Sequence, residues 1–173
     1  MKKKEIIDFI ISIALLILAS VILLMPTFKV DNLKTILIII FSFYTVLKLT
    51  QFLLIFKEKD LESLFTSIVS GGCLVSSFLI ELSAKNLALI LLIWIGLMSL
   101  IKLKKADFYH DRENKIWILR LFMLFFFLTS GLLTGMNLFY ESSVQIIVLG
   151  YFFFINSLLD SIDPIVLYIG ARK

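Results

Sequence analysis

Lys48 is a charged side chain inside a long apolar stretch, residues 35–56. It lies nine residues before Lys57, which at about 1.5 Å rise per residue is roughly 13 Å along a helix from the nearest polar segment. Tyr44 and Gln51, four residues before it and three after it, share its helical face. A lysine at this depth costs about 3 kcal/mol unless it reaches the interface, pairs or meets water. Snorkelling, an internal ion pair, and a transport or proton-relay role are therefore all open.

The last apolar stretch offers an acidic partner for Lys48. Asn156 and Asp160 are four residues apart and so share one helical face. If this helix continues to Ile169, Asp160 lies near the depth of Lys48 and the two side chains can pair. If the helix ends near Leu159, the acid is solvated at the membrane surface, which is the simpler interpretation. The sequence leaves the choice between these two open.

Small residues are concentrated in two other apolar stretches. Gly131 and Gly135 form a small-xxx-small pair, and Gly71 and Gly72 lie among several serines. In lipid, small residues let neighbouring helix backbones approach closely. The simplest interpretation is helix packing within one chain. The alternatives are a seam for a second copy or another membrane protein, and a substrate path.

The sequence contains none of the common catalytic motifs. There is no His-Glu-x-x-His, no Gly-x-Ser-x-Gly and no glycine-rich phosphate loop. Asp107, His110, Asp111 and Glu113 are of types that bind metals, but they include one histidine and lie among basic residues. The single Cys73 has no partner for a disulfide within the chain. We therefore expect no enzymatic activity, no cofactor and no metal site.

The elements that position these residues are apolar stretches long enough to cross a bilayer. The 173-residue chain is 60% hydrophobic and 17% charged, and its mean hydropathy is +1.03. A helix of about 20 residues spans the ~30 Å hydrocarbon core, and strands of a barrel would be shorter and alternate in polarity. We predict an all-α membrane bundle of six transmembrane helices in a single domain, residues 1–173. The stretches are 6–25, 35–56, 61–82, 87–103, 116–139 and one that begins near 144.

The net charge of +4 is distributed unevenly between the two ends of such a bundle. Six crossings place Lys29, Lys34 and Lys85 on one side and nearly all the other lysines and arginines on the opposite side. Basic residues favour the cytoplasmic side, where anionic lipid headgroups attract them. We therefore expect both termini in the cytoplasm and no binding of nucleic acid. The basic N-terminus followed by an apolar run resembles a secretory signal, but the run has the length of a retained first helix.

The six stretches pair into three hairpins with a common pattern. The hairpins cover about 5–57, 61–104 and 115–163. Each has a small residue midway along its first helix, another small or polar residue or a proline seven positions later, and a small or polar residue midway along its second helix. These residues are Ala19, Pro26 and Thr45, then Ser70, Ser77 and Ser99, then Ser130, Asn137 and Asn156. We predict a threefold hairpin repeat.

This pattern resembles the HdeD family, which are six-helix bacterial inner-membrane proteins built from a short two-helix repeat. The resemblance covers nearly the whole chain and includes the proline at the outer end of the first helix, although Ser77 and Asn137 replace it in the later hairpins. It implies a multi-pass protein of the bacterial cytoplasmic (plasma) membrane with a role in acid or envelope stress response. It supplies no catalytic residues.

The functional prediction is a non-enzymatic membrane protein of this kind. The alternative is a small-solute transport component, such as the substrate-binding subunit of an energy-coupling-factor transporter. Those subunits dock through an alanine-xxx-alanine face on the first helix, a spacing that Ser12, Ala14, Ala19 and Ser20 do not provide. An accessory subunit of a larger complex is the third option. The bilayer is the expected partner in every case. A second copy or another membrane protein is a possible further partner, and the sequence does not identify a ligand.

Overall fold

The computed structural model describes residues 3–28, 32–56, 61–80, 83–111, 115–140 and 144–170. Within them the chain forms six long helices and no strand. The elements are α1 (Lys3–Leu24), the short 3-10 helix η1 (Met25–Phe28), α2 (Leu33–Leu54), α3 (Leu61–Leu79), α4 (Ala84–His110), α5 (Ile116–Phe139) and α6 (Gln145–Gly170). All six long helices contain segments long and apolar enough to cross a membrane. The predicted all-α architecture with six membrane-spanning helices is confirmed.

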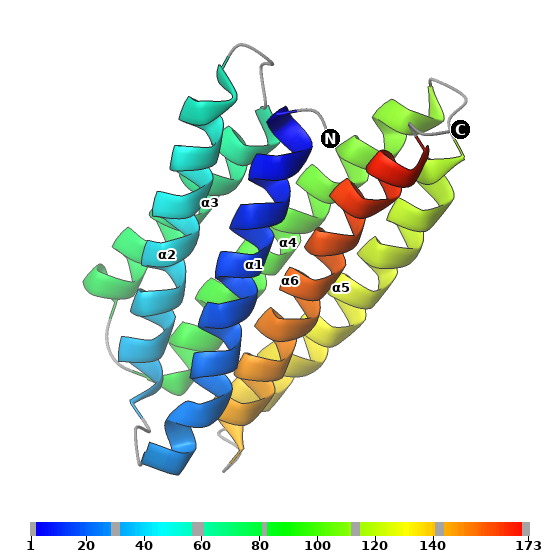
Figure 1. Ribbon diagram of the computed structural model, residues 1–173. Helices are drawn as coiled ribbons and strands as arrows, with labels where there is room; N and C mark the ends of the chain where they lie inside the picture. The colour runs from blue at the N-terminus through cyan, green and yellow to red at the C-terminus, as the bar shows by residue number, and fades with distance from the viewer. Residues whose placement is uncertain are drawn as a thin grey trace.

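The helices run up and down in two layers of three (Figure 1). In the view of the figure, α2, α1 and α6 form the front layer, and α3, α4 and α5 lie behind it. The start of α1 and the end of α6 lie at the same end of the bundle. We call this the terminal end.

The helices form a closed ring in which contacts alternate between extensive and sparse. The extensive pairs are α2 with α3, α4 with α5, and α6 with α1. The two helices of each predicted hairpin, α1 with α2, α3 with α4, and α5 with α6, contact one another less. Each helix therefore packs mainly against a helix of an adjacent hairpin, and less against the other helix of its own hairpin.

Local sequence signals account for the starts of two helices. The side chain of Asn32 accepts a hydrogen bond from the backbone N–H of Thr35 and caps α2 at 3.2 Å. Ser83 caps α4 in the same way through the N–H of Asn86, at 3.1 Å. Such caps satisfy N–H groups that the first helical turn leaves unpaired.

Two helices extend further than the hydropathy predicts. The expected end of the fourth helix near Leu103 is wrong, because α4 continues for two more turns to His110. The interpretation that ended the sixth helix near Leu159 is also wrong, because α6 continues past Pro164 to Gly170. Lys105, in the added turns of α4, pairs with Glu62 of α3, and Asp160, where the added turns of α6 begin, pairs with Lys102 of α4. The charge alone therefore does not mark the end of a helix here.

Aromatic side chains fill the centre of the bundle. Trp94 of α4 is fully buried and lies edge-on to Tyr44 of α2, with 5.3 Å between the ring centroids. Phe153 of α6 lies 5.5 Å from the same tryptophan. The cluster is completed by Phe41, Phe127 and Phe152. The outward faces carry many exposed Leu, Ile, Val and Phe side chains, as expected for helices surrounded by lipid.

Candidate functional site

Charged and polar side chains from all six helices gather in the terminal half of the bundle. We call this group the ionic cluster. Most of its members lie within the apolar spans, where a charge persists only if it is paired or hydrated. The members are Asp8 of α1, Lys48 and Gln51 of α2, Glu62 of α3, Lys102 and Lys105 of α4, Arg120 of α5 and Asp160 of α6.

Two ion pairs connect α4 to its neighbours within the ionic cluster. Lys102 Nζ lies 2.5 Å from Asp160 Oδ1 and so joins α4 to α6, and these side chains are 16% and 20% exposed. Lys105 Nζ lies 2.6 Å from Glu62 Oε2 and joins α4 to α3. Because Lys102 and Lys105 are three residues apart, they project from nearly the same face of α4 towards different helices. The two lysines therefore hold three helices together at one level.

A hydrogen-bonded chain connects α1 to α2 in the same cluster. Gln51 Nε2 donates to Asp8 Oδ1 at 2.6 Å, and Lys48 Nζ donates to Gln51 Oε1 at 3.0 Å. Gln51 is buried although its side chain is polar. The amide therefore relays the interaction between a cation on its own helix and an acid on the neighbouring one.

Two cations of the cluster, Arg120 and Lys102, lie over aromatic rings. Arg120 is 5% exposed, and its guanidinium carbon lies 4.1 Å from the ring centroid of Tyr109. Lys102 Nζ lies 5.1 Å from the ring of Phe127, in addition to its ion pair. Ring faces attract cations electrostatically, and more strongly where water is excluded. A cavity of about 30 Å³ between Glu62, Lys102, Arg120 and Asp160 is large enough for one water molecule.

The structure separates the polar residues predicted from the sequence into two groups. Lys48, Gln51 and Asp160 belong to the ionic cluster, whereas Tyr44 and Asn156 lie in the aromatic centre. The hypothesised pair of Lys48 with Asp160 is not formed, because Asp160 pairs with Lys102 and Lys48 donates to Gln51. The sequence argument matched the two residues by depth but could not place their helices around the ring.

Two buried hydrogen bonds lie within the aromatic centre. Asn156 Nδ2 donates to the hydroxyl of Tyr44 at 2.8 Å, and both residues are 1% exposed. Trp94 Nε1 donates to Ser70 Oγ at 3.0 Å. These bonds connect α6 to α2 and α4 to α3. They satisfy polar atoms that apolar surroundings would otherwise leave without a partner.

Loss of the Tyr44 hydroxyl tests the first of these bonds. We expect Tyr44→Phe to lower the free energy of unfolding in detergent by about 1–2 kcal/mol, because the Asn156 amide loses its buried acceptor. Tyr151→Phe is the matched control, since Tyr151 is 56% exposed on the same helix as Asn156. Equal stability of the two variants, measured by titration with dodecyl sulfate, would contradict the role of the hydrogen bond.

The glycines singled out in the sequence have different surroundings. A Cβ atom on Gly131 would lie 3.0 Å from Ile95 and 3.1 Å from Phe152, and one on Gly135 would lie 2.7 Å from the Cγ atom of Leu92. These two glycines therefore allow α5 to pack closely against α4 and α6. A Cβ on Gly71 would make ordinary contact with Thr45, and Gly72 has open space around it.

Sequence reasoning missed several members of the cluster. The hydropathy ends the fourth span near Leu103, so Lys102 is not singled out from the sequence, and neither is Glu62 or Arg120. The sequence contains one signal for the two lysines of α4. Lys102, Lys105 and Ala106 are spaced three and four residues apart, as on one face of a helix that continues past Leu103, and Ala106 is buried on that face. Gly150, which faces Leu23 of α1, was also not singled out.

The geometry defines a class of protein and not a reaction. In the part of the chain that the structure describes, no three side chains of His, Cys, Asp or Glu converge. Its six long apolar helices make the chain a helical, multi-pass membrane protein, and several side chains of the ionic cluster pair with one another. No known protein family, curated protein or solved structure matches it.

Proposed function

We propose that the chain is a non-enzymatic protein of the bacterial cytoplasmic membrane, without transport activity, that acts in the response to acid or envelope stress. The proposed role in the stress response is based on the resemblance to the HdeD family. The observation that supports a non-transporting protein is the filled centre of the bundle. Six buried aromatic side chains from α2, α4, α5 and α6 contact one another there, and interiors packed in this way leave no path for a solute.

The proposal includes the threefold hairpin repeat. In a ring of three equivalent hairpins, the second helix of each hairpin would contact the first helix of the next one. The extensive pairs α2–α3, α4–α5 and α6–α1 follow this rule, and the sparse pairs are those within the hairpins. The alternation of contacts around the ring is what three copies of one unit would produce.

The proposed orientation has both termini in the cytoplasm. Lys4, Lys104, Lys105 and Lys115 lie near the terminal end of the bundle, and Lys34 and Lys85 lie at the opposite end, beside the starts of α2 and α4. The positive-inside rule favours the cytoplasm for the end with more basic residues. A cysteine-accessibility measurement at introduced sites in both ends would test this orientation directly.

A transport component would need a cavity for its solute within the bundle. A cavity of about 530 Å³ lies at the terminal end between α3 and α4 and not at the centre. The subunits weighed as the alternative bind their ligands near the external loops. The position of the cavity therefore does not favour that alternative over a structural role.

Acid challenge of bacterial cells tests the proposed function. We expect cells that produce the protein, in a strain lacking its own HdeD-family protein, to survive acid exposure at least several-fold better than cells with an empty vector. Purified protein in vesicles should not accelerate the decay of a pH gradient. Normal accumulation without a survival gain would contradict the stress role, and a protein-dependent leak of protons would contradict the non-transporting role.

A further inference from the structure

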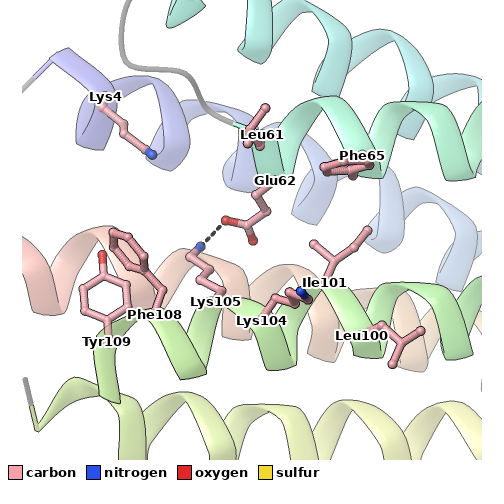
Figure 2. Close-up of a pocket in the computed structure, with 10 residues that line it drawn as sticks. All are labelled: Lys4, Leu61, Glu62, Phe65, Leu100, Ile101, Lys104, Lys105, Phe108 and Tyr109. Atoms are coloured by element: carbon pink, nitrogen blue, oxygen red, sulfur yellow. Dashed lines mark ion pairs between the residues drawn. The ribbon is translucent and has the colours of Figure 1, made fainter. Parts of the chain in front are cut away.

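The cavity of about 530 Å³ is an open groove at the terminal end. It lies between α3 and α4. Figure 2 shows Leu61 and Phe65 of α3 along one wall and Leu100 and Phe108 of α4 along the other, with Lys4 of α1 at one end. We call this the α3–α4 groove.

The walls of the groove are apolar and are not covered by protein. Leu61 and Phe65 are four residues apart on α3, and Leu100 and Phe108 are eight residues apart on α4, so each pair forms a row along one helical face. Their exposed fractions lie between 48% and 60%. In a bilayer such surfaces contact lipid. The groove is therefore a recess in the lipid-facing surface.

Basic side chains give the groove its charge. Three lysines, Lys4, Lys104 and Lys105, line it together with one acid, Glu62. Lys105 neutralises Glu62 across the groove at 2.6 Å, as the dashed line in Figure 2 marks. Lys104 is exposed and has no ion pair with any side chain in the described part of the chain. The groove thus keeps an unneutralised ammonium group among its apolar walls.

The depth of Lys104 matches the headgroup layer. Lys104 lies six residues before the end of α4 at His110, or roughly 9 Å along the helix. Leu100 is one turn deeper, on the same face. A cation near the interface with an apolar recess directly below it is complementary to a lipid that carries a negative headgroup above an acyl chain. Basic pockets between transmembrane helices bind anionic headgroups in this way.

We propose that the α3–α4 groove binds one anionic phospholipid, with the headgroup phosphate at Lys104 and an acyl chain between the apolar walls. The volume falls within the range of roughly 300–1,000 Å³ that is typical of small-molecule sites. The proposal requires only that the terminal end lies at a headgroup layer. It is therefore independent of the stress role and of the leaflet that this end faces.

Native mass spectrometry can test the proposal with the full-length protein. The protein is released from detergent after incubation with equal amounts of phosphatidylglycerol and phosphatidylcholine of the same chain length. We expect it to retain one phosphatidylglycerol in preference to phosphatidylcholine. Lys104→Ala should weaken this retention about fivefold, the effect of one lysine near a lipid headgroup, and Lys104→Glu should weaken it further.

Lys115→Glu is the matched control for charge. Lys115 is exposed near the same end of the bundle but does not line the groove. We expect this variant to retain phosphatidylglycerol like the wild type. An equal loss in the Lys104→Glu and Lys115→Glu variants would overturn the proposal, because it would show a general attraction of the basic end for anionic lipid.

A second variant tests the apolar part of the site. Leu100 is 60% exposed, so Leu100→Trp should fold and should partly fill the groove. We expect it to reduce the retention of the lipid with Lys104 left in place. Unchanged retention would show that the acyl chain lies elsewhere. Displacement of the lipid by soluble glycerol phosphate would show a site for phosphate alone, and either result would overturn the proposal.

Discussion

Asp160→Leu is expected to lower the free energy of unfolding by about 3 kcal/mol, and Lys102→Met in the same chain is expected to restore most of that loss. Removal of one member of a mostly buried ion pair leaves the other charge without compensation in an apolar environment. Lys102 and Asp160 are 2.5 Å apart and largely buried, so each depends on the other. Replacement of both by apolar side chains leaves no buried charge and is often neutral.

The choice of second substitution makes this prediction specific. Lys48 lies on another helix and donates to Gln51, so Lys48→Met should not restore the stability that Asp160→Leu removes. Unfolding by dodecyl sulfate in mixed micelles compares the wild type with Asp160→Leu alone, with Lys102→Met added and with Lys48→Met added. Recovery with Lys48→Met and not with Lys102→Met would show that the sequence-based pair, and not the one seen in the structure, forms in the membrane.

Gly150→Ala is expected to destabilise the protein by about 2 kcal/mol. A Cβ atom on Gly150 of α6 would lie 2.9 Å from the Cγ atom of Leu23 and 3.1 Å from its backbone nitrogen. The leucine side chain can change its rotamer, but the backbone of α1 can move only with its helix. Overpacking of this kind typically costs 1–3 kcal/mol. The effect should be large because α1 and α6 form the most extensive helix pair of the bundle.

Gly96→Ala is the control for Gly150→Ala. Gly96 also lies within a helix, and a Cβ atom there would have no neighbour within 4 Å. The added methyl group should be neutral or stabilising by up to about 1 kcal/mol through helix propensity. Thermal unfolding of the two variants in the same detergent gives the comparison. Similar shifts for both would mean that α1 and α6 are not in close contact at Gly150.

The six membrane-spanning helices could be predicted from the sequence because each needs an apolar stretch long enough to cross the hydrocarbon core, and hydropathy detects such stretches. The fifth helix was predicted at 116–139 and is observed as Ile116–Phe139, and the six spans are all present. The end of α4 could not be predicted in this way. Hydropathy treats Lys102 as the end of a span, whereas the structure keeps it within the helix, where it pairs with Asp160, 58 residues further along the chain.

The candidate site was harder to predict than the fold because it depends on the order of helices around the ring. Depth along a helix can be read from the sequence, and it placed Lys48 and Asp160 at similar levels. Position around the bundle depends on which helices are neighbours, and for Asp160 the neighbour that supplies a cation is α4. Tyr44 and Asn156 illustrate the same limit, since 112 residues separate two groups that share one hydrogen bond.

The contact between α1 and α6 has a consequence for the order of assembly in the membrane. Helices enter the bilayer in the order of synthesis, so α2 with α3 and α4 with α5 can dock soon after insertion. α1 must wait for the sixth helix before its largest interface can form. Until then, the surface around Leu23 that finally receives Gly150 faces lipid or another protein of the insertion machinery. The bundle is therefore an open chain of helices throughout its biogenesis, and the arrival of α6 closes it in a single final step.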